Sequence, residues 1–222
     1  MENASILNYL DLLVQKLALQ PAEVARIASS VGKIKGKLEK WFENDGLKEV
    51  RTFGSYDRGT LISRLVDTNS DIDIMVIFYE KKWESQTYLN KLKSFAEEHY
   101  PKAERYQDHP TIVIEDEKIK FELVPCVFKE ETFFLEEKYL VPQRQNSELE
   151  WIETEPDFLM NKLNEYVKTK PTLINLILLF KYWNLCNGSQ YKTFKIERFI
   201  IDKFDYEEAL DYNFFRLIDK LK

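Results

Sequence analysis

The chain opens with two stretches in which apolar residues recur every three or four positions. These stretches cover residues 6–17 and, after Pro21, residues 24–42. The spacing is that of one apolar face on an α-helix, and proline suits the first turn of a helix. The pattern therefore predicts a short helix and then a long, strut-like helix, which the polar residues 44–46 end.

The central part of the chain has the pattern of strands. Residues 49–53 and 71–78 predict two strands, with a short helical or turn segment over 57–66 between them. Residues 111–114 and 118–124 predict the two arms of a hairpin that turns at acidic residues.

The rest of the chain is mainly helical in pattern. Residues 91–100, 157–167 and 172–185 predict helices, and the last of these is apolar nearly all round, which predicts burial on most sides. The tail from 196 to 222 is also predicted to be helical. No period persists over 130–155, so a long loop with short elements is expected there.

Composition and charge limit the class of protein. Of the 222 residues, 44% are hydrophobic, six are glycine and seven are proline, which excludes disordered, fibrous and low-complexity classes. The net charge of −6 argues against a broad surface for duplex nucleic acid, so stable duplex binding is not expected. An anionic substrate must therefore be met by local groups.

The sequence lacks the common patterns of targeting segments and of zinc or haem sites. The amino-terminal stretch lacks the basic segment of a signal peptide, and the longest apolar run, 173–180, is too short to span a bilayer. We therefore expect a cytoplasmic protein with no membrane partner. The two cysteines and two histidines are not spaced as zinc or haem ligands.

An acidic pair at the start of one predicted strand is the first candidate for chemistry. Alternate residues of a strand face the same side, so Asp71 and Asp73 project together while Ile72 and Ile74 point into the core. Two carboxylates in one small volume are unfavourable unless protonated or neutralised, and a divalent cation is the usual solution. The alternative is an acidic pair that merely begins a strand after a turn.

Two further features strengthen the metal interpretation. Gly54 and Ser55 end the preceding strand, where a glycine permits close backbone approach and a serine with neighbouring amides can hold phosphate oxygens. An ordinary turn is the alternative for this pair. If the strand with Glu122 lies beside the strand of Asp71, a third carboxylate joins the first two. Three carboxylates can hold two magnesium ions about 3.5–4 Å apart, which indicates nucleotidyl transfer.

These residues lie in runs that resemble a known superfamily. The runs at 54–60, 70–76 and 122–125 read GSYDRGT, SDIDIMV and ELVP. They resemble the polymerase-β-type nucleotidyltransferases and, more closely, the bacterial CD-NTases (cGAS-like, SMODS) of anti-phage CBASS signalling. Further similarity lies in WIETEP, KYWN and TFKIE, which begin at Trp151, Lys181 and Thr193.

The resemblance implies an α+β fold of two lobes. The first, residues 1–155, would be a mixed β-sheet catalytic lobe with the N-terminal helices, and the second, 156–222, a helical lobe shorter than in relatives. By motif matching, one set of residues would bind magnesium and carry out catalysis, namely Asp71, Asp73 and Glu122. A second set would bind the nucleotide phosphates, namely Gly54, Ser55, Lys181 and Thr193.

Two positions depart from the family pattern, and a third, Lys181, can be interpreted from the sequence directly. The family more often has Asp where this chain has Glu122, and Ser where it has Thr193. Lys181, at the end of an apolar helix, needs an anionic partner or a route to solvent. The alternative for this lysine is a surface side chain that reaches water.

The function implied is magnesium-dependent synthesis of a cyclic or linear oligonucleotide messenger from nucleoside triphosphates, including ATP, with release of pyrophosphate. Two Mg²⁺ or Mn²⁺ ions would be the cofactors, and a regulatory protein is a candidate partner. Two alternatives stay open. One is nucleotidyl transfer to RNA or a protein, as in MNT-type antitoxins. The other is a catalytically silent nucleotide-binding module.

Overall fold

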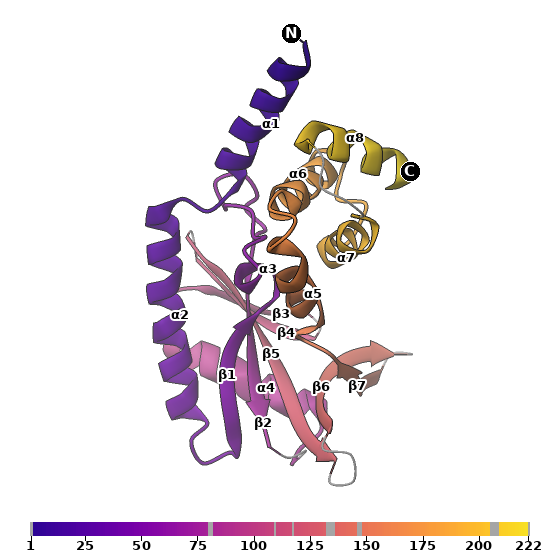
Figure 1. Cartoon of the computed structure of the whole chain (residues 1–222). Coiled ribbons are helices and arrows are strands. Elements are labelled where there is room, and N and C mark those ends of the chain that lie inside the picture. Colours follow the sequence, from indigo (N-terminus) through magenta and orange to yellow (C-terminus); the bar gives the residue numbers. More distant parts are fainter. Residues whose placement is uncertain are drawn as a thin grey trace. The chain divides into compact units, whose positions relative to one another are not determined.

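The computed structural model describes residues 2–79, 82–108, 110–116, 118–131, 136–145, 148–204 and 209–221 (Figure 1). The helices are α1 Glu2–Leu17, α2 Pro21–Trp41, α3 Gly54–Asp57, α4 Ser85–His99, α5 Phe158–Val167, α6 Leu173–Cys186, α7 Thr193–Lys203 and α8 Leu210–Leu221. The strands are β1 Leu47–Phe53, β2 Ile72–Phe78, β3 Glu104–Asp108, β4 Thr111–Glu115, β5 Lys120–Glu131, β6 Glu136–Gln145 and β7 Glu148–Thr154.

The strands form one mixed sheet, which confirms the predicted α+β class. Its order is β1-β2-β5-β4-β3, and β6 pairs with both β5 and β7. β2 and β5 are parallel, whereas the other pairs are antiparallel. β5 therefore joins the sheet's parts: its first half lies between β2 and β4, and its second half pairs with β6.

One face of this sheet carries apolar side chains packed against α4. Ile74, Val76 and Phe78 of β2 are buried, as are Phe121 and Leu123 of β5. Such a buried side chain contributes about 1.5–3 kcal/mol to the free energy of unfolding. Figure 1 shows α4 lying across the sheet, and its contacts with β3, β4 and β5 agree with that view.

Aromatic contacts fasten the long helix to the same region. The rings of Phe42 and Tyr88 lie 5.3 Å and 4.8 Å from that of Phe78, between centroids. At the end of α2, Trp41 contacts Phe95 and His99 edge-on. The predicted strut helix is therefore fixed at its C-terminal end by ring packing.

The chain divides into two compact units. The helical unit consists of residues 1–23, 57–70 and 157–222, and the sheet unit consists of residues 24–56 and 71–156. These units differ from the predicted domains 1–155 and 156–222, because α1 and the segment 57–70 group with the C-terminal helices.

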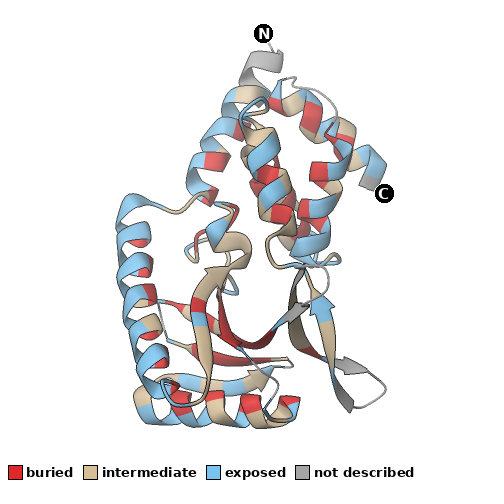
Figure 2. Ribbon diagram, turned by 60° about the horizontal axis from the view of Figure 1, so that its bottom comes forward, coloured by how far each residue is buried: buried red, intermediate tan, exposed pale blue. Residues whose placement is uncertain are grey.

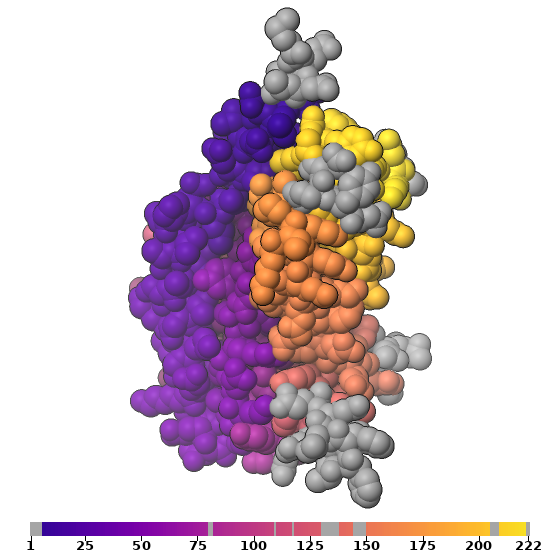
Figure 3. All heavy atoms as spheres, viewed as in Figure 1, coloured from indigo at the N-terminus to yellow at the C-terminus, as the bar shows by residue number. Residues whose placement is uncertain are grey.

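The helical unit is built around α6. The buried side chains of α6 lie on most sides of this helix, as predicted. Helices α1 and α8 contribute to the same core (Figure 2). The core includes Leu10, Val14, Leu17, Leu176, Ile177, Phe180, Ile200 and Leu217. In Figure 3 the side chains of α1 (indigo) meet those of α8 (yellow). This packing explains why the first helix belongs with helices distant in sequence.

Hydrogen bonds hold the segment 57–70 in the helical unit. The Ser63 amide donates to the carbonyl oxygen of Leu17 at 2.8 Å. The Ser63 hydroxyl donates to a carboxylate oxygen of Glu23 at 2.7 Å, and the Arg64 amide donates to the other at 3.2 Å. Because Ser63 and Glu23 are buried, these bonds satisfy groups that would otherwise be costly to desolvate.

The structure corrects three parts of the predicted secondary structure. The expected long loop over 130–155 is wrong, because β6 and β7 lie there. The expected helix over 91–100 begins earlier, at Ser85, and β3 was not predicted. These strands are rich in charged residues, and β3 is held by pairing with β4, β6 with β5 and β7 with β6 rather than by a local apolar pattern.

Within the residues that the structure describes, no helix is both long enough and apolar enough to cross a membrane.

Candidate active site

The register of β2 and β5 brings the predicted carboxylates together. Asp73 and Glu122 are direct neighbours across this parallel pair. Asp71 lies two residues before Asp73, and Lys120 two residues before Glu122, so all four side chains project from the same face. The condition set by the sequence, that the Glu122 strand lies beside the Asp71 strand, is confirmed. We call these four residues the carboxylate face.

Lys120 forms ion pairs within this face. Its Nζ lies 2.8 Å from Oε1 of Glu122 and 3.8 Å from Oδ2 of Asp71. Burial, and then the charge of Glu122, raise the pKa of Asp71 to about 7, although Lys120 opposes the rise. The face therefore holds more negative charge than one ammonium neutralises, and a further cation would stabilise the ionised form of Asp71.

Gly54 brings the backbone against this carboxylate face. It follows β1 and begins α3 with a φ of +76°. A Cβ at this position would lie 2.0 Å from Oδ2 of Asp73. No other amino acid fits without moving Asp73, so the close approach expected of this glycine is present. Ser55 follows in α3, and the predicted phosphate turn thus adjoins the predicted metal ligands.

The residue types fit a divalent cation. Asp71, Asp73 and Glu122 supply hard oxygen ligands from one face, which Mg²⁺ and Mn²⁺ prefer. Among the residues that the structure describes, however, no three acidic, histidine or cysteine side chains are already arranged around a common metal position. The chemistry of the donors therefore suits the ion, and the ammonium of Lys120 lies among them.

Lys120 is the residue of this face that sequence reasoning missed as a functional candidate. The signal was its spacing, because a residue two positions before Glu122 must share its face. That spacing shows on which side of the sheet Lys120 lies. It does not show the ion pairs of Lys120, because these depend on the register of β5 with β2.

Lys181 lies in the helical unit and has the anionic partner that the sequence required. Its Nζ lies 2.5 Å from Oε1 of Glu197 and donates to the carbonyl oxygen of Thr60 at 2.8 Å. Lys181 is 6% exposed and Glu197 1% exposed. The alternative of a surface lysine that reaches water is therefore wrong.

Glu197 is the centre of this buried network. Arg58 donates to it at 2.6 Å through Nε, and the hydroxyl of Thr60 donates at 2.9 Å. Burial alone raises the pKa of Glu197, but Lys181 and Arg58 outweigh it and hold the pKa below its ordinary value. Arg58 and Glu197 both lie in runs that resemble the family, but the sequence does not predict that they pair.

The predicted site residues thus fall into two groups. Gly54, Ser55 and the three carboxylates belong to the sheet unit, and Lys181 and Thr193 belong to the helical unit. Thr193 is exposed at the first position of α7.

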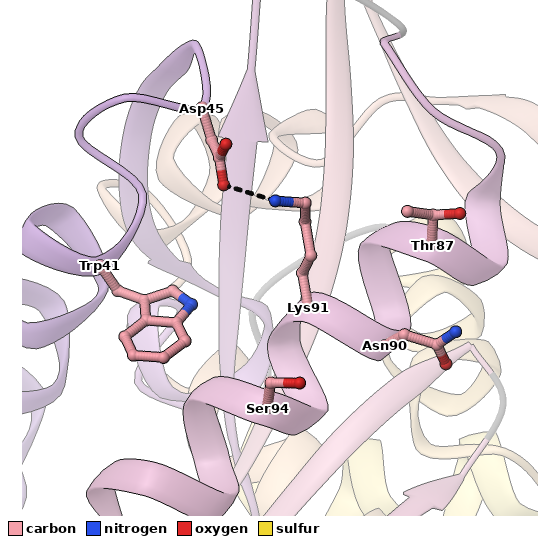
Figure 4. Close-up of a pocket in the computed structure, with 6 residues that line it drawn as sticks. All are labelled: Trp41, Asp45, Thr87, Asn90, Lys91 and Ser94. Carbon is pink, nitrogen blue, oxygen red and sulfur yellow. Dashed lines mark hydrogen bonds and ion pairs between the residues drawn. The ribbon is translucent and has the colours of Figure 1, made fainter.

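A hollow of about 410 Å³ in the sheet unit contains none of these residues (Figure 4). It is lined by Trp41, Asp45, Thr87, Asn90, Lys91 and Ser94. Lys91 pairs with Asp45 at 2.8 Å and lies 4.3 Å from the ring centre of Trp83. The charges of this hollow are thus matched internally, and it is separate from the carboxylate face.

The chain matches a protein-family model. Residues 5–166 match the model of the Second Messenger Oligonucleotide or Dinucleotide Synthetase domain, SMODS. No curated protein matches the chain in sequence.

Solved structures of CD-NTases have the same fold. CdnG of Bradyrhizobium diazoefficiens, in complex with GTP, has a TM-score of 0.74 at 13% identity, covering 93% of this chain and 72% of CdnG. DncV of Vibrio cholerae, a cyclic AMP-GMP synthase with a linear intermediate, has a TM-score of 0.68 at 13% identity, covering 90% and 72%.

CdnC of E. coli MS115-1 with ATP has a TM-score of 0.65 at 16% identity, covering 86% of this chain and 62% of CdnC. CdnC is also known in a complex with a HORMA protein. At these identities the likeness shows the fold, and this chain spans about three fifths of the length of CdnC.

Proposed function

The chain belongs to the SMODS family, and we propose that it is a nucleotidyltransferase that makes a cyclic or linear oligonucleotide messenger from nucleoside triphosphates. Family membership implies second-messenger synthesis that depends on a divalent metal. The observation that carries the proposal for this chain is the carboxylate face, with Gly54 packed against Asp73.

In this proposal the carboxylates share one task and the phosphate turn has another. Asp71, Asp73 and Glu122 would hold two Mg²⁺ or Mn²⁺ ions, which would lower the pKa of the attacking hydroxyl and neutralise the leaving pyrophosphate. Gly54 permits the triphosphate to approach the backbone beside Asp73, and Ser55 donates its hydroxyl to a phosphate oxygen. The hydroxyl oxygen bonds to the α-phosphorus, its proton passes to water, and the bond between the α-phosphorus and the pyrophosphate oxygen breaks, which releases pyrophosphate.

We also propose phosphate contacts from Lys181 and Thr193. The exposed hydroxyl of Thr193 can donate directly. Lys181 is held by Glu197 and Thr60, so a phosphate contact from its ammonium would require exchange of one of these partners. Its present partners make Lys181 a structural residue first.

The first prediction concerns the carboxylate pair. Replacing both aspartates, Asp71→Asn with Asp73→Asn, should lower pyrophosphate release from mixed NTPs with Mg²⁺ at least about a hundredfold, because metal stabilisation of the transition state is worth several kcal/mol. Asp45→Asn removes a carboxylate elsewhere in the sheet unit and should retain activity. Undiminished release by the double variant would refute the proposal.

Labelled NTPs separate this function from the two alternatives. Label in small products supports messenger synthesis, whereas label on added RNA or protein indicates macromolecular transfer. Nucleotide binding without turnover indicates a silent module. Mass analysis of the products from all four NTPs identifies the bases that are joined.

The anti-phage role and a regulatory partner are part of the same proposal. The HORMA complex of CdnC supports the search for a protein partner of this chain. A CD-NTase that acts in defence should give phage resistance that the double variant of Asp71 and Asp73 lacks.

A further inference from the structure

The position of Lys120 within the carboxylate face has a consequence for metal binding. Its side chain is only 13% exposed, and its ammonium contacts Glu122 and lies within ion-pair distance of Asp71. Both carboxylates belong to the set proposed to hold metal. The ammonium of Lys120 therefore already pairs with the carboxylates that an incoming metal ion would bind.

The electrostatic balance of the face explains why a cation belongs there. Glu122 is in register with Asp73, and Asp71 adjoins them, so three carboxylates share one side of two strands. Like charges in partly desolvated surroundings are unfavourable unless a positive charge lies between them. Lys120, fixed on the same strand as Glu122, supplies that charge without a ligand.

A further carboxylate, outside the three proposed to bind metal, offers the ammonium of Lys120 another position. Glu115 of β4 is the register partner of Lys120, so both side chains project from one face. The flexible lysine side chain can turn from Glu122 toward Glu115 by rotation of its own bonds. Displacement from the metal set therefore does not expel the ammonium into an apolar region.

We propose that Lys120 is a resident counter-cation of the carboxylate face, which holds Glu122 and Asp71 before metal binds and is displaced by the metal. This role rests on the proposed function, since it assigns the carboxylates to metal. Lys120 is thus a positioning residue that sets the metal concentration at which the face becomes loaded.

The test measures metal binding without nucleotide. Mn²⁺ is titrated into the full chain and the free ion is followed by electron paramagnetic resonance. Lys120→Met should bind Mn²⁺ about tenfold more tightly than the wild type, because a competing unit charge a few ångströms away is removed. Lys120→Arg, which keeps the charge, should stay near the wild type. Lys118→Met, on the neighbouring turn, is the matched control and should not differ.

Thermal unfolding separates this role from ordinary structural support. In EDTA, Lys120→Met should unfold at a lower temperature than the wild type, because the carboxylates lose their counter-charge. Saturating Mn²⁺ should remove that difference. A lysine that only supports the fold would lower the unfolding temperature equally with and without metal, which would overturn the proposal. If the Met variant does not fold, Lys120→Gln replaces it in both measurements.

The outcomes distinguish this inference from the proposed function. If the wild type makes labelled products but Lys120→Met binds Mn²⁺ no more tightly than the wild type, only the counter-cation role is refuted. If Mn²⁺ binds more tightly to the variant but neither protein transfers nucleotides, the counter-cation stands and the enzymatic proposal fails. If neither protein binds Mn²⁺ without nucleotide, the counter-cation role is refuted, and the labelled-NTP assay decides the enzymatic proposal.

Discussion

At Gly54 the backbone has a φ of +76°, and an added Cβ would lie 2.0 Å from Oδ2 of Asp73. Gly59 has a similar φ of +68°, but nothing lies within 4 Å of its Cβ position. Both glycines relieve the same backbone strain, and only one of them also relieves a collision. The pair therefore offers a way to separate backbone conformation from close approach.

We predict that Gly54→Ala lowers both the free energy of unfolding and the pyrophosphate release more than Gly59→Ala does. The left-handed conformation alone should lower the free energy of unfolding by about 1–2 kcal/mol in each variant. Gly54→Ala must in addition displace Asp73, so it should lose further stability and most of the pyrophosphate release. Urea unfolding and activity measure the two effects, and equal losses in both variants would contradict the assigned role of Gly54.

Individual side chains of the site differ in how far the sequence could predict them. Asp71, Asp73 and Glu122 could be proposed as one set because the period of a strand and short motifs carry that information locally. The ion pairs of Lys120 could not be predicted in this way, because they depend on how β2 and β5 align. Likewise, the need of Lys181 for an anion was readable from its apolar helix, but the identity of Glu197 was not.

At the scale of elements, a buried network joins α6, α7 and the segment 57–63. Glu197 on α7 accepts hydrogen bonds from Arg58 and Thr60, and it pairs with Lys181 on α6. One side chain thus connects two helices to an irregular segment. Its loss leaves two cations without their shared carboxylate, in surroundings where desolvation is costly.

We predict that Glu197→Gln lowers the free energy of unfolding by about 3–5 kcal/mol near neutral pH. Asp202→Asn, on the same helix but at a partly exposed ion pair, should cost less than about 1 kcal/mol. Urea unfolding measures both variants. Similar small losses in the two would show that the network adds no stability.

The same substitution has a predicted pH dependence. Lys181 and Arg58 hold the pKa of Glu197 below its ordinary value of 4.5. A carboxyl with a lowered pKa stabilises the folded state above its unfolded pKa, and this stabilisation is lost as the pH falls through the folded pKa. The difference between the wild type and Glu197→Gln should therefore shrink below about pH 4.5. A constant difference across that range would contradict the lowered pKa.

Elements were predicted best where their stability is local. The helical periods of α1 and α2 reveal one apolar face each, while β2 and α6 are apolar along most of their length, and the structure has these elements close to the expected bounds. β6 and β7 were missed because Glu, Lys and Gln dominate them. Each pairs with the strand that precedes it in the chain, β6 with β5 and β7 with β6, so the sequence lacked a clear apolar pattern rather than a nearby partner.

At the scale of the whole molecule, the chain crosses between its two compact units at positions next to the site. One crossing follows Tyr56 and another precedes Asp71. Ser55 and Asp71 are thus close to the points where the backbone leaves and re-enters the sheet unit. Part of the net charge of −6 lies on the carboxylate face. A bound metal–nucleotide complex should therefore stabilise the folded protein in addition to serving as the substrate.

We predict that Mn²⁺ with a non-hydrolysable NTP analogue, at about 100 times its Kd, raises the free energy of unfolding by about 2.7 kcal/mol. Addition of EDTA should reverse the gain. Thermal unfolding should show no such gain for the double variant of Asp71 and Asp73, whereas Asp45→Asn should retain it. An equal gain in the double variant would place the ligand elsewhere.

The parallel pairing of β2 with β5 also determines how the site is assembled in time. β1 and β2 are separated in the chain only by residues 54–71, but α4, β3 and β4 are synthesised before β5 can join them. Loop closure makes such a distant pairing slower than a local one. The two aspartates therefore exist on a nascent chain before the third carboxylate does. Because Glu122 and Lys120 arrive on the same strand, the folding step that adds the last negative charge also adds its neutralising ammonium.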